Sequence, residues 1–167
     1  MSLQKITELN AKMAEARAEI VALAKSSGDD IIKELFAPLW ETGVLAASWE
    51  QYTPYFNDGD ACEFHVRADE MPLQWPGNPG VDGYESSASH ILYTLQSTET
   101  RWGVPEQKAA LIAQGFTAEK VKLADEICDV IAKVLHDNEE LLYAAYGDHI
   151  EVTVTPNGVT VDEYAHD

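Results

Sequence analysis

Two short Asp/His clusters near the C-terminus are the residues of this sequence best suited to chemistry. Asp148 and His149 precede "IEVTVTPNGVTVDEYA", and His166 and Asp167 follow it. Imidazole and carboxylate groups bind zinc and other transition metals, so two facing clusters could hold one, with His65 as a further ligand if it approaches. Two facing histidines could also repel each other when protonated, or lie solvated at a frayed chain end. A divalent metal is the one cofactor that the sequence suggests.

Whether these clusters meet depends on the register of the hairpin that carries them. Alternating apolar residues on both sides of an Asn-Gly pair predict two antiparallel strands and a tight turn over residues 148–167. A two-residue Asn157-Gly158 turn pairs Val154 with Val161 and places the two histidines opposite each other. A three-residue loop would pair Val154 with Thr160 instead. We favour the first register, because a slip of one residue exposes the apolar face.

A second hairpin is predicted over residues 48–67, "SWEQYTPYFNDGDACEFHVR". A two-residue Asp58-Gly59 turn pairs Gln51 with Val66 and Glu50 with Arg67. The face expected to be mostly apolar then holds Trp49, Thr53, Tyr55, Cys62, Phe64 and Val66. The opposite face is expected to hold Glu50, Tyr52, Pro54, Phe56, Glu63, His65 and Arg67.

The second of these faces is a candidate for partner binding, with Tyr52 and Phe56 as its aromatic contacts. The acids Asp58, Asp60 and Glu63 suggest calcium, but they lack the ligand spacing of an EF-hand loop. A tight turn accounts for the same residues.

The N-terminal segment 1–45 is expected to form a helical pair. Apolar residues recur at intervals of three and four, which suits either a helical hairpin or a short coiled coil, and the coiled coil could form a homodimer. They are Ile6, Leu9, Met13, Ala16, Ile20 and Leu23. The stretch "SSGDD", residues 26–30, is predicted to end the first helix and cap the second, which Pro38 limits or kinks.

Residues 68–104 form a loop-rich insertion, in which "HILYTLQSTETRW" could be a strand or a short helix. Trp75 could be an exposed anchor for a partner, or it could pin this loop onto the body. Helices are predicted over 105–146, with Gly115 as a stop, Thr117 as a cap and Gly147 as a terminator. Together the elements predict a single α+β domain over 1–167, with an antiparallel sheet of two hairpins packed against a long helix.

The charge of the chain restricts its partners. The 167 residues include 29 Asp and Glu against 11 Lys and Arg, for a net charge of -18. The last 34 residues carry eight acids and no Lys or Arg. Such a field repels phosphate, so neither nucleic acid nor an anionic membrane is expected as a direct partner. The acids could form a solubilising surface, a cation-binding face or an imitation of a nucleic-acid backbone.

Several function classes lack their sequence signature. No Walker A, GxGxxG or GxSxG motif is present. Cys62 and Cys128 lie far apart and are expected to be buried free thiols. With no apolar run near the roughly 20 residues of a membrane helix and no signal-peptide pattern, we expect a soluble cytoplasmic protein.

Two stretches carry a family resemblance. "SWEQYTPYFNDGDACEFHV" and "YGDHIEVTVTPNGVTVDEYAHD" resemble a family of small acidic proteins of bacteriophages and bacteria. The resemblance implies a phage or prophage setting and no catalytic residues. The leading hypothesis is a non-enzymatic binding protein that acts on a host or phage protein through its acidic surface, in the sharpest version by occupying a nucleic-acid-binding groove. The alternative is a metal-binding protein or metal-dependent enzyme built on Asp148, His149, His166 and His65.

Overall fold

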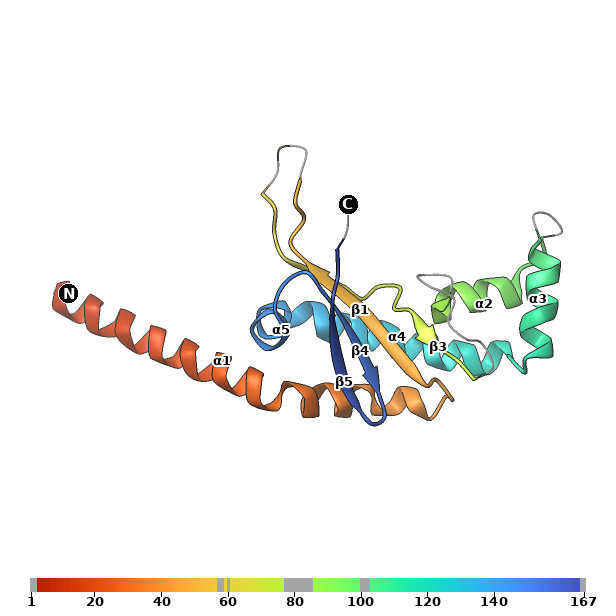
Figure 1. Cartoon of the computed structure of the whole chain (residues 1–167), viewed down its shortest axis with the longest axis horizontal. Coiled ribbons are helices and arrows are strands. Elements are labelled where there is room, and N and C mark those ends of the chain that lie inside the picture. Colours follow the sequence, from red (N-terminus) through yellow and green to blue (C-terminus); the bar gives the residue numbers. More distant parts are fainter. Residues whose placement is uncertain (1–2, 57–58, 60, 77–85, 100–102, 166–167) are drawn as a thin grey trace.

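The chain has an α+β fold (Figure 1), which confirms the expected class. The computed structural model describes residues 3–56, 59, 61–76, 86–99 and 103–165. Its helices are α1 (Leu3–Trp40), α2 (Ala88–Gln96), α3 (Val104–Ala113), α4 (Ala118–Asp137) and α5 (Glu139–Tyr146). Its strands are β1 (Ala46–Tyr52), β2 (His65–Arg67), β3 (Leu73–Gln74), β4 (Ile150–Thr155) and β5 (Gly158–Glu163). The strands pair in the antiparallel order β2-β1-β4-β5, and β3 also pairs with β1.

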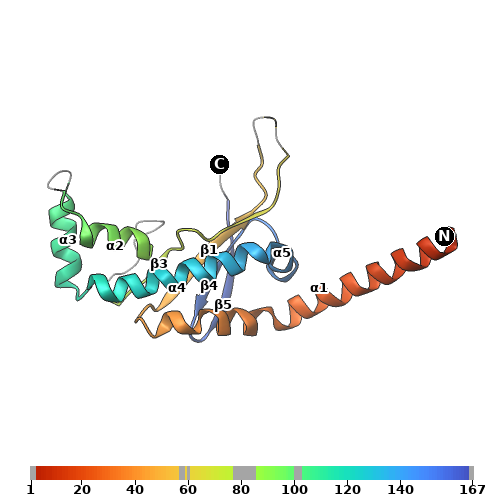
Figure 2. The same ribbon diagram turned by 180° about the vertical axis from the view of Figure 1, so that it is seen from behind.

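Helices cover one face of the sheet. α4 and the C-terminal part of α1 lie behind the strands in Figure 1 and in front of them in Figure 2. The core between these layers contains Trp49 and Val152, both fully buried, and the Phe36 ring stacks on the Trp49 ring at 5.8 Å. The burial of these apolar side chains is the main contribution that holds α1 against the sheet.

α1 is one continuous helix of 38 residues, so the predicted helical pair is wrong. Gly28 does not end the helix. It lies where α5 approaches α1, and a Cβ built on it would come within 3.3 Å of the Ala145 Cβ. The glycine therefore allows close helix packing where the sequence suggested a stop. Pro38 lies inside the last turn of the helix.

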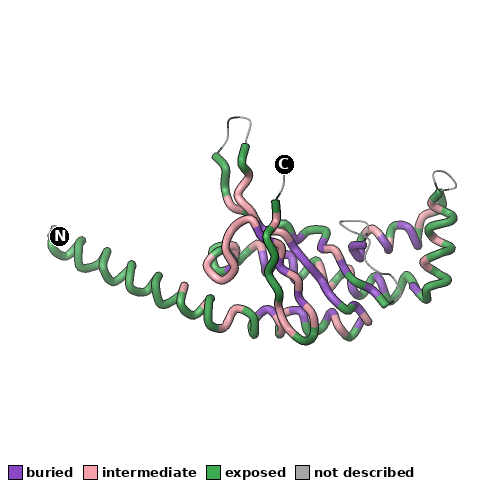
Figure 3. Tube along the Cα trace, viewed as in Figure 1, coloured by how far each residue is buried: buried purple, intermediate pink, exposed green. Residues whose placement is uncertain are grey.

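The two halves of α1 differ in burial (Figure 3). Ile32, Phe36 and Leu39 are buried in the core, whereas every residue from Gln4 to Ile20 is exposed. The N-terminal half therefore projects from the body (Figure 1), with its apolar residues uncovered in this single chain.

The middle of the chain contains regular structure that its composition left open. Residues 88–96 form a helix, and Ser87 caps it by accepting a hydrogen bond from the His90 backbone N–H at 3.3 Å. In the 105–146 region, Thr117 caps α4 as predicted, and Gly147 follows α5 with a φ of 98°. Cys62 is exposed, which contradicts its expected burial.

The first hairpin has the predicted register. Glu50 pairs with Arg67, Gln51 with Val66 and Tyr52 with His65. Regular pairing ends there, and Tyr55 is exposed although it was placed on the apolar face. The predicted Asp58-Gly59 turn cannot be compared with the structure, because Asp58 and Asp60 lie outside the described residues.

The second hairpin has neither of the two predicted registers. Its turn is Pro156-Asn157, and Gly158 begins β5 by pairing with Thr155. Val154 consequently faces Val159. Side chains alternate with a period of two, so this register keeps the same faces as the favoured one, and face matching alone could not separate them. The fixed φ of proline suits the first central position of a turn.

Candidate protein-binding face

The face of the sheet that points away from the core is polar and aromatic. Among the described residues no helix crosses it, and it is turned toward the viewer in Figure 1. We call it the outer face. Its members come from alternate strand positions and the adjoining ends, and they are Glu50, Tyr52, His65, Arg67, His149, Glu151, Asp162 and Tyr164.

An acidic row crosses the outer face. Arg67 pairs with Glu50, Glu50 with Glu151, and Glu151 with Asp162, on four neighbouring strands. Directly opposed side chains begin roughly 5 Å apart, and like charges in such positions destabilise a sheet. The three adjacent carboxylates therefore repel one another, and Arg67 offsets this repulsion at one end of the row.

A hollow of about 390 Å³ adjoins this row. Its lining includes Glu50, Arg67 and Glu151 from the row, together with Asp69 and Glu70 from the chain that follows β2. Four carboxylates around one guanidinium give the hollow a negative field, and its walls concentrate that field.

An aromatic cluster lies beside the acidic row. The Tyr52 ring lies 5.6 Å from the Tyr164 ring and 6.5 Å from the His149 ring, and the Tyr55 ring stacks on His149 at 4.5 Å. The guanidinium of Arg67 lies over the Tyr52 ring, with its carbon 5.4 Å from the ring centroid. The outer face thus already receives one guanidinium against an aromatic ring.

Asp148 holds the end of this cluster in place. Its Oδ1 accepts hydrogen bonds from the backbone N–H of Thr53 at 2.7 Å and of His149 at 2.9 Å, and its Oδ2 accepts one from the Thr53 hydroxyl at 2.8 Å. Burial raises the pKa of Asp148, but these three hydrogen bonds and the nearby His149 outweigh it and leave the pKa below its usual value. His149 has a φ of 54°, in the left-handed region that few side chains adopt.

Tyr164 joins the two parts of the face. Its hydroxyl donates a hydrogen bond to the Glu50 carboxylate, so the aromatic cluster and the acidic row are in contact. Partial burial, followed by this hydrogen bond and the charge of Glu50, raises the pKa of Tyr164 to about 12.

The three residues predicted to bind a partner have different positions. Tyr52 is in the aromatic cluster, and Phe56 is 80% exposed just beyond it. Trp75 is 2% exposed: its ring packs edge-on against Phe116 at 5.2 Å, and its indole N–H donates to the Ser86 carbonyl at 3.4 Å. Trp75 therefore pins its loop, and the exposed-anchor interpretation is wrong.

The structure describes three of the four residues predicted to bind metal, namely Asp148, His149 and His65. The observed register sets Tyr164, rather than His166, opposite His149, and His166 lies outside the described residues. His65 lies 3.6 Å from a carboxylate oxygen of Glu139, on α5. Within the described ranges no three His, Cys, Asp or Glu side chains are grouped so that they could hold a metal ion.

Tyr164, Glu151 and Asp162 are members of the outer face that the sequence reasoning missed as site residues. The alternation in both strands already placed Glu151 and Asp162 on the polar side. The residues beside Glu151 and Asp162 depend on the register of the hairpin. The observed register differs from the favoured one by two residues in β5, so each of the two acids has a different cross-strand neighbour. A Pro156-Asn157 turn, had it been predicted, would have placed Tyr164 opposite His149.

None of the protein-family models, curated proteins or solved structures compared with this chain matches it. In the part of the chain that the structure describes, no helix has both the length and the apolar character needed to cross a membrane.

Proposed function

We propose that the protein is a non-enzymatic binding protein whose outer face takes a basic segment of another protein. The observation that carries this proposal is the contact between the acidic row and the aromatic cluster, joined by Tyr164 and Glu50. Lys and Arg side chains bind to such a surface in two ways at once, by ion pairs with carboxylates and by packing on aromatic rings.

The position of Arg67 supports this choice of partner. Its guanidinium lies over the Tyr52 ring, as that of an incoming arginine could, and its strand position is opposite Glu50. Tyr55 is 69% exposed at the edge of the same cluster and adds apolar contact area. The net charge of -18 would speed the encounter with a basic partner, most strongly at low salt.

A binding titration tests the proposal with a defined probe. The affinity of a fluorescent nona-arginine peptide is measured by anisotropy for the wild type and for the double variant Glu50→Gln, Glu151→Gln. The matched control is Glu8→Gln, Glu15→Gln on the exposed half of α1, which removes the same charge far from the sheet. We expect the dissociation constant to rise about tenfold for the first variant and less than threefold for the control.

Equal losses in the two variants would mean that net charge alone attracts the peptide, and the proposed face would be wrong. Tyr55→Ser provides a second measurement, because it leaves every charge in place. It should weaken peptide binding about threefold and leave the thermal unfolding midpoint unchanged.

The biological setting belongs to the same proposal. The resemblance of the two hairpins to small acidic phage and bacterial proteins favours a host or phage protein as the partner, in the cytoplasm of the host cell. In its sharpest form, the acids occupy a nucleic-acid-binding groove of that partner. An excess of duplex DNA should then displace the partner from the immobilised protein, and failure of DNA to compete would leave basic-segment binding without mimicry.

The metal-dependent alternative stays a prediction. It requires His166 to join Asp148 and His149, while His65 would have to leave Glu139. Metal analysis of the purified protein tests it, and a stoichiometric metal that is lost in His149→Ala would favour this alternative over the binding protein.

A further inference from the structure

The exposed half of α1 carries an apolar stripe at heptad spacing. Its members are Ile6, Leu9, Met13, Ala16, Ile20 and Leu23. All six side chains are exposed, and Met13 is 71% exposed. A helix that packs on nothing is only marginally stable in water, so a projecting helix with such a stripe needs a partner that covers it.

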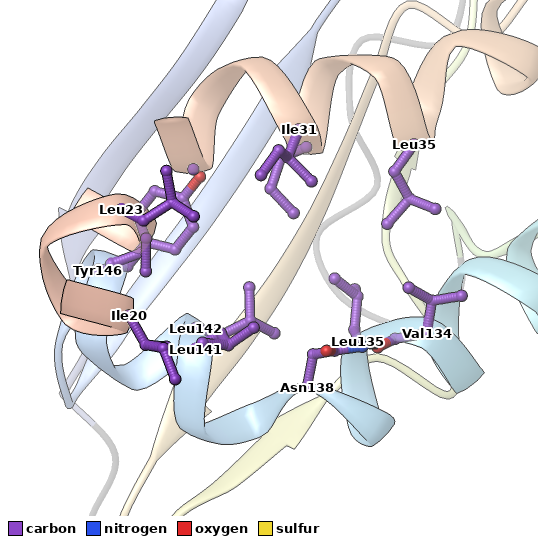
Figure 4. Close-up of a pocket in the computed structure, with 14 residues that line it drawn as sticks. Ile20, Leu23, Ile31, Leu35, Val134, Leu135, Asn138, Leu141, Leu142 and Tyr146 are labelled. Atoms are coloured by element: carbon purple, nitrogen blue, oxygen red, sulfur yellow. Dashed lines mark hydrogen bonds between the residues drawn. The ribbon is translucent and has the colours of Figure 1, made fainter. Parts of the chain in front are cut away.

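The stripe runs into a groove on the body. α1, α4 and α5 enclose an apolar groove of about 240 Å³ (Figure 4). Ile20 and Leu23 belong both to the stripe and to the wall of the groove, and Leu141 and Leu142 face them from α5. One continuous apolar track thus leads from the tip of α1 to the body.

We propose that this track is covered by the same track of a second copy, with the two α1 helices antiparallel. The proposal is independent of the function proposed for the outer face. The arrangement that matches the stripe to itself pairs Ile6 with Leu23, Leu9 with Ile20 and Met13 with Ala16 of the second copy. The largest exposed side chain, that of Met13, then lies against the smallest, so the seam has even width.

The charged residues beside the stripe favour antiparallel over parallel pairing of the two α1 helices. In the antiparallel pair, Lys12 lies beside Glu19 of the second copy, and symmetry creates this attractive contact twice. In a parallel coiled coil with the same stripe, Lys12 would lie beside Arg17 of the second copy, which is repulsive twice. Parallel pairing would also place Ala16 against Ala16 of the second copy, so that little apolar surface would be buried in this layer of the coiled coil.

The size of the contact suits a reversible dimer. The pairing spans about 27 Å of helix, and it would bury on the order of 1,200 Å² over both copies. That area is at the lower limit for specific interfaces. The first turns of each helix would reach the mouth of the groove on the other copy, since Ile6 lies against Leu23 there. The two bodies then lie at opposite ends of the paired helices, and both outer faces remain free for a partner.

Sedimentation velocity of the full chain, up to about 0.5 mM, tests the dimer. We expect a monomer–dimer equilibrium in the wild type and loss of the dimer in Met13→Lys. The matched control is Ala14→Lys, which adds the same charge at the neighbouring exposed position outside the stripe. A wild type that stays monomeric over the whole concentration range would overturn the proposal and leave the stripe to a different protein. Equal weakening of the dimer by Met13→Lys and Ala14→Lys would also overturn it.

A charge exchange tests the direction. Glu19→Lys alone and Lys12→Glu alone should each raise the dimer dissociation constant about tenfold, because each turns two attractive contacts into repulsive ones. The double variant Lys12→Glu, Glu19→Lys should restore the wild-type value. Tighter dimerisation of Lys12→Glu would indicate a parallel pair, since the introduced carboxylate would then attract Arg17 of the second copy, and the antiparallel proposal would be overturned.

Discussion

The indole N–H of Trp49 donates a hydrogen bond to the side-chain oxygen of Gln51 at 3.1 Å, and both residues are fully buried on the inner face of β1. The amide nitrogen of Gln51 donates in turn to the carbonyls of Leu142 at 3.2 Å and Gly147 at 2.7 Å. One side chain therefore ties the central strand to the C-terminal end of α5. A buried amide with three partners fixes this junction, because any misplacement leaves polar groups unpaired.

Replacing Gln51 by Met should destabilise the fold by about 2–4 kcal/mol, because it leaves the buried Trp49 N–H without its acceptor and removes the hydrogen bonds to two carbonyls. Urea unfolding followed by tryptophan fluorescence measures this free energy. The control is Gln74→Met, the same substitution at an exposed position of β3. A loss below about 1 kcal/mol would mean that the junction can rearrange or admit water.

Gly28 should tolerate only the smallest addition. Gly28→Ala gains about 1 kcal/mol of helix propensity but presses on Ala145, so the net change should stay within about 1 kcal/mol. Gly28→Leu should cost about 1–3 kcal/mol, since it forces α5 away from α1. Thermal unfolding compares these variants with Ala22→Leu, at an exposed position of the same helix. A neutral Gly28→Leu would contradict the close packing of α1 on α5.

Asp148 should make the end of the sheet sensitive to acid. The pKa of its carboxyl is lowered in the folded protein, so its contribution to stability is complete above the unfolded pKa of roughly 3.9 and is lost as the pH falls through the lower folded value. Asp148→Asn should therefore be less stable than the wild type at neutral pH, and the difference should shrink below about pH 4. Urea unfolding at a series of pH values measures both curves. A difference that does not change with pH would assign the effect to shape rather than charge.

The two cysteines should differ in reactivity. Cys62 is exposed, whereas burial, with smaller contributions from Asp125 and Asp129, raises the pKa of Cys128 to about 12. The thiolate is the reactive form, so a thiol reagent at about pH 8 should modify one cysteine rapidly in the folded protein and both in denaturant. Cys62→Ser should abolish the rapid phase. Two rapid phases in the native wild type would mean that α4 opens at Cys128.

The sequence alone determined those features that depend on local pattern. Alternation and turn residues located both hairpins, and in the first the pairing of Glu50 with Arg67 followed from the Asp-Gly turn. Helical spacing and caps located α3 and α4, with Thr117 as the cap of α4. These features follow from periodicity and local hydrogen bonds, which neighbouring residues specify.

Tertiary structure decided whatever depends on a partner far along the chain. Gly28 has the sequence signature of a helix stop, yet α1 runs through it, and the approach of Ala145 leaves little room for a side chain there. Face alternation is the same in the favoured register of the second hairpin and in the observed one, and the observed one places Tyr164 rather than His166 opposite His149. That pairing brings Tyr164 into the aromatic cluster of the outer face. A pattern of period two fixes which side of a strand a residue lies on, while its neighbour on that side is fixed by the turn and the packing.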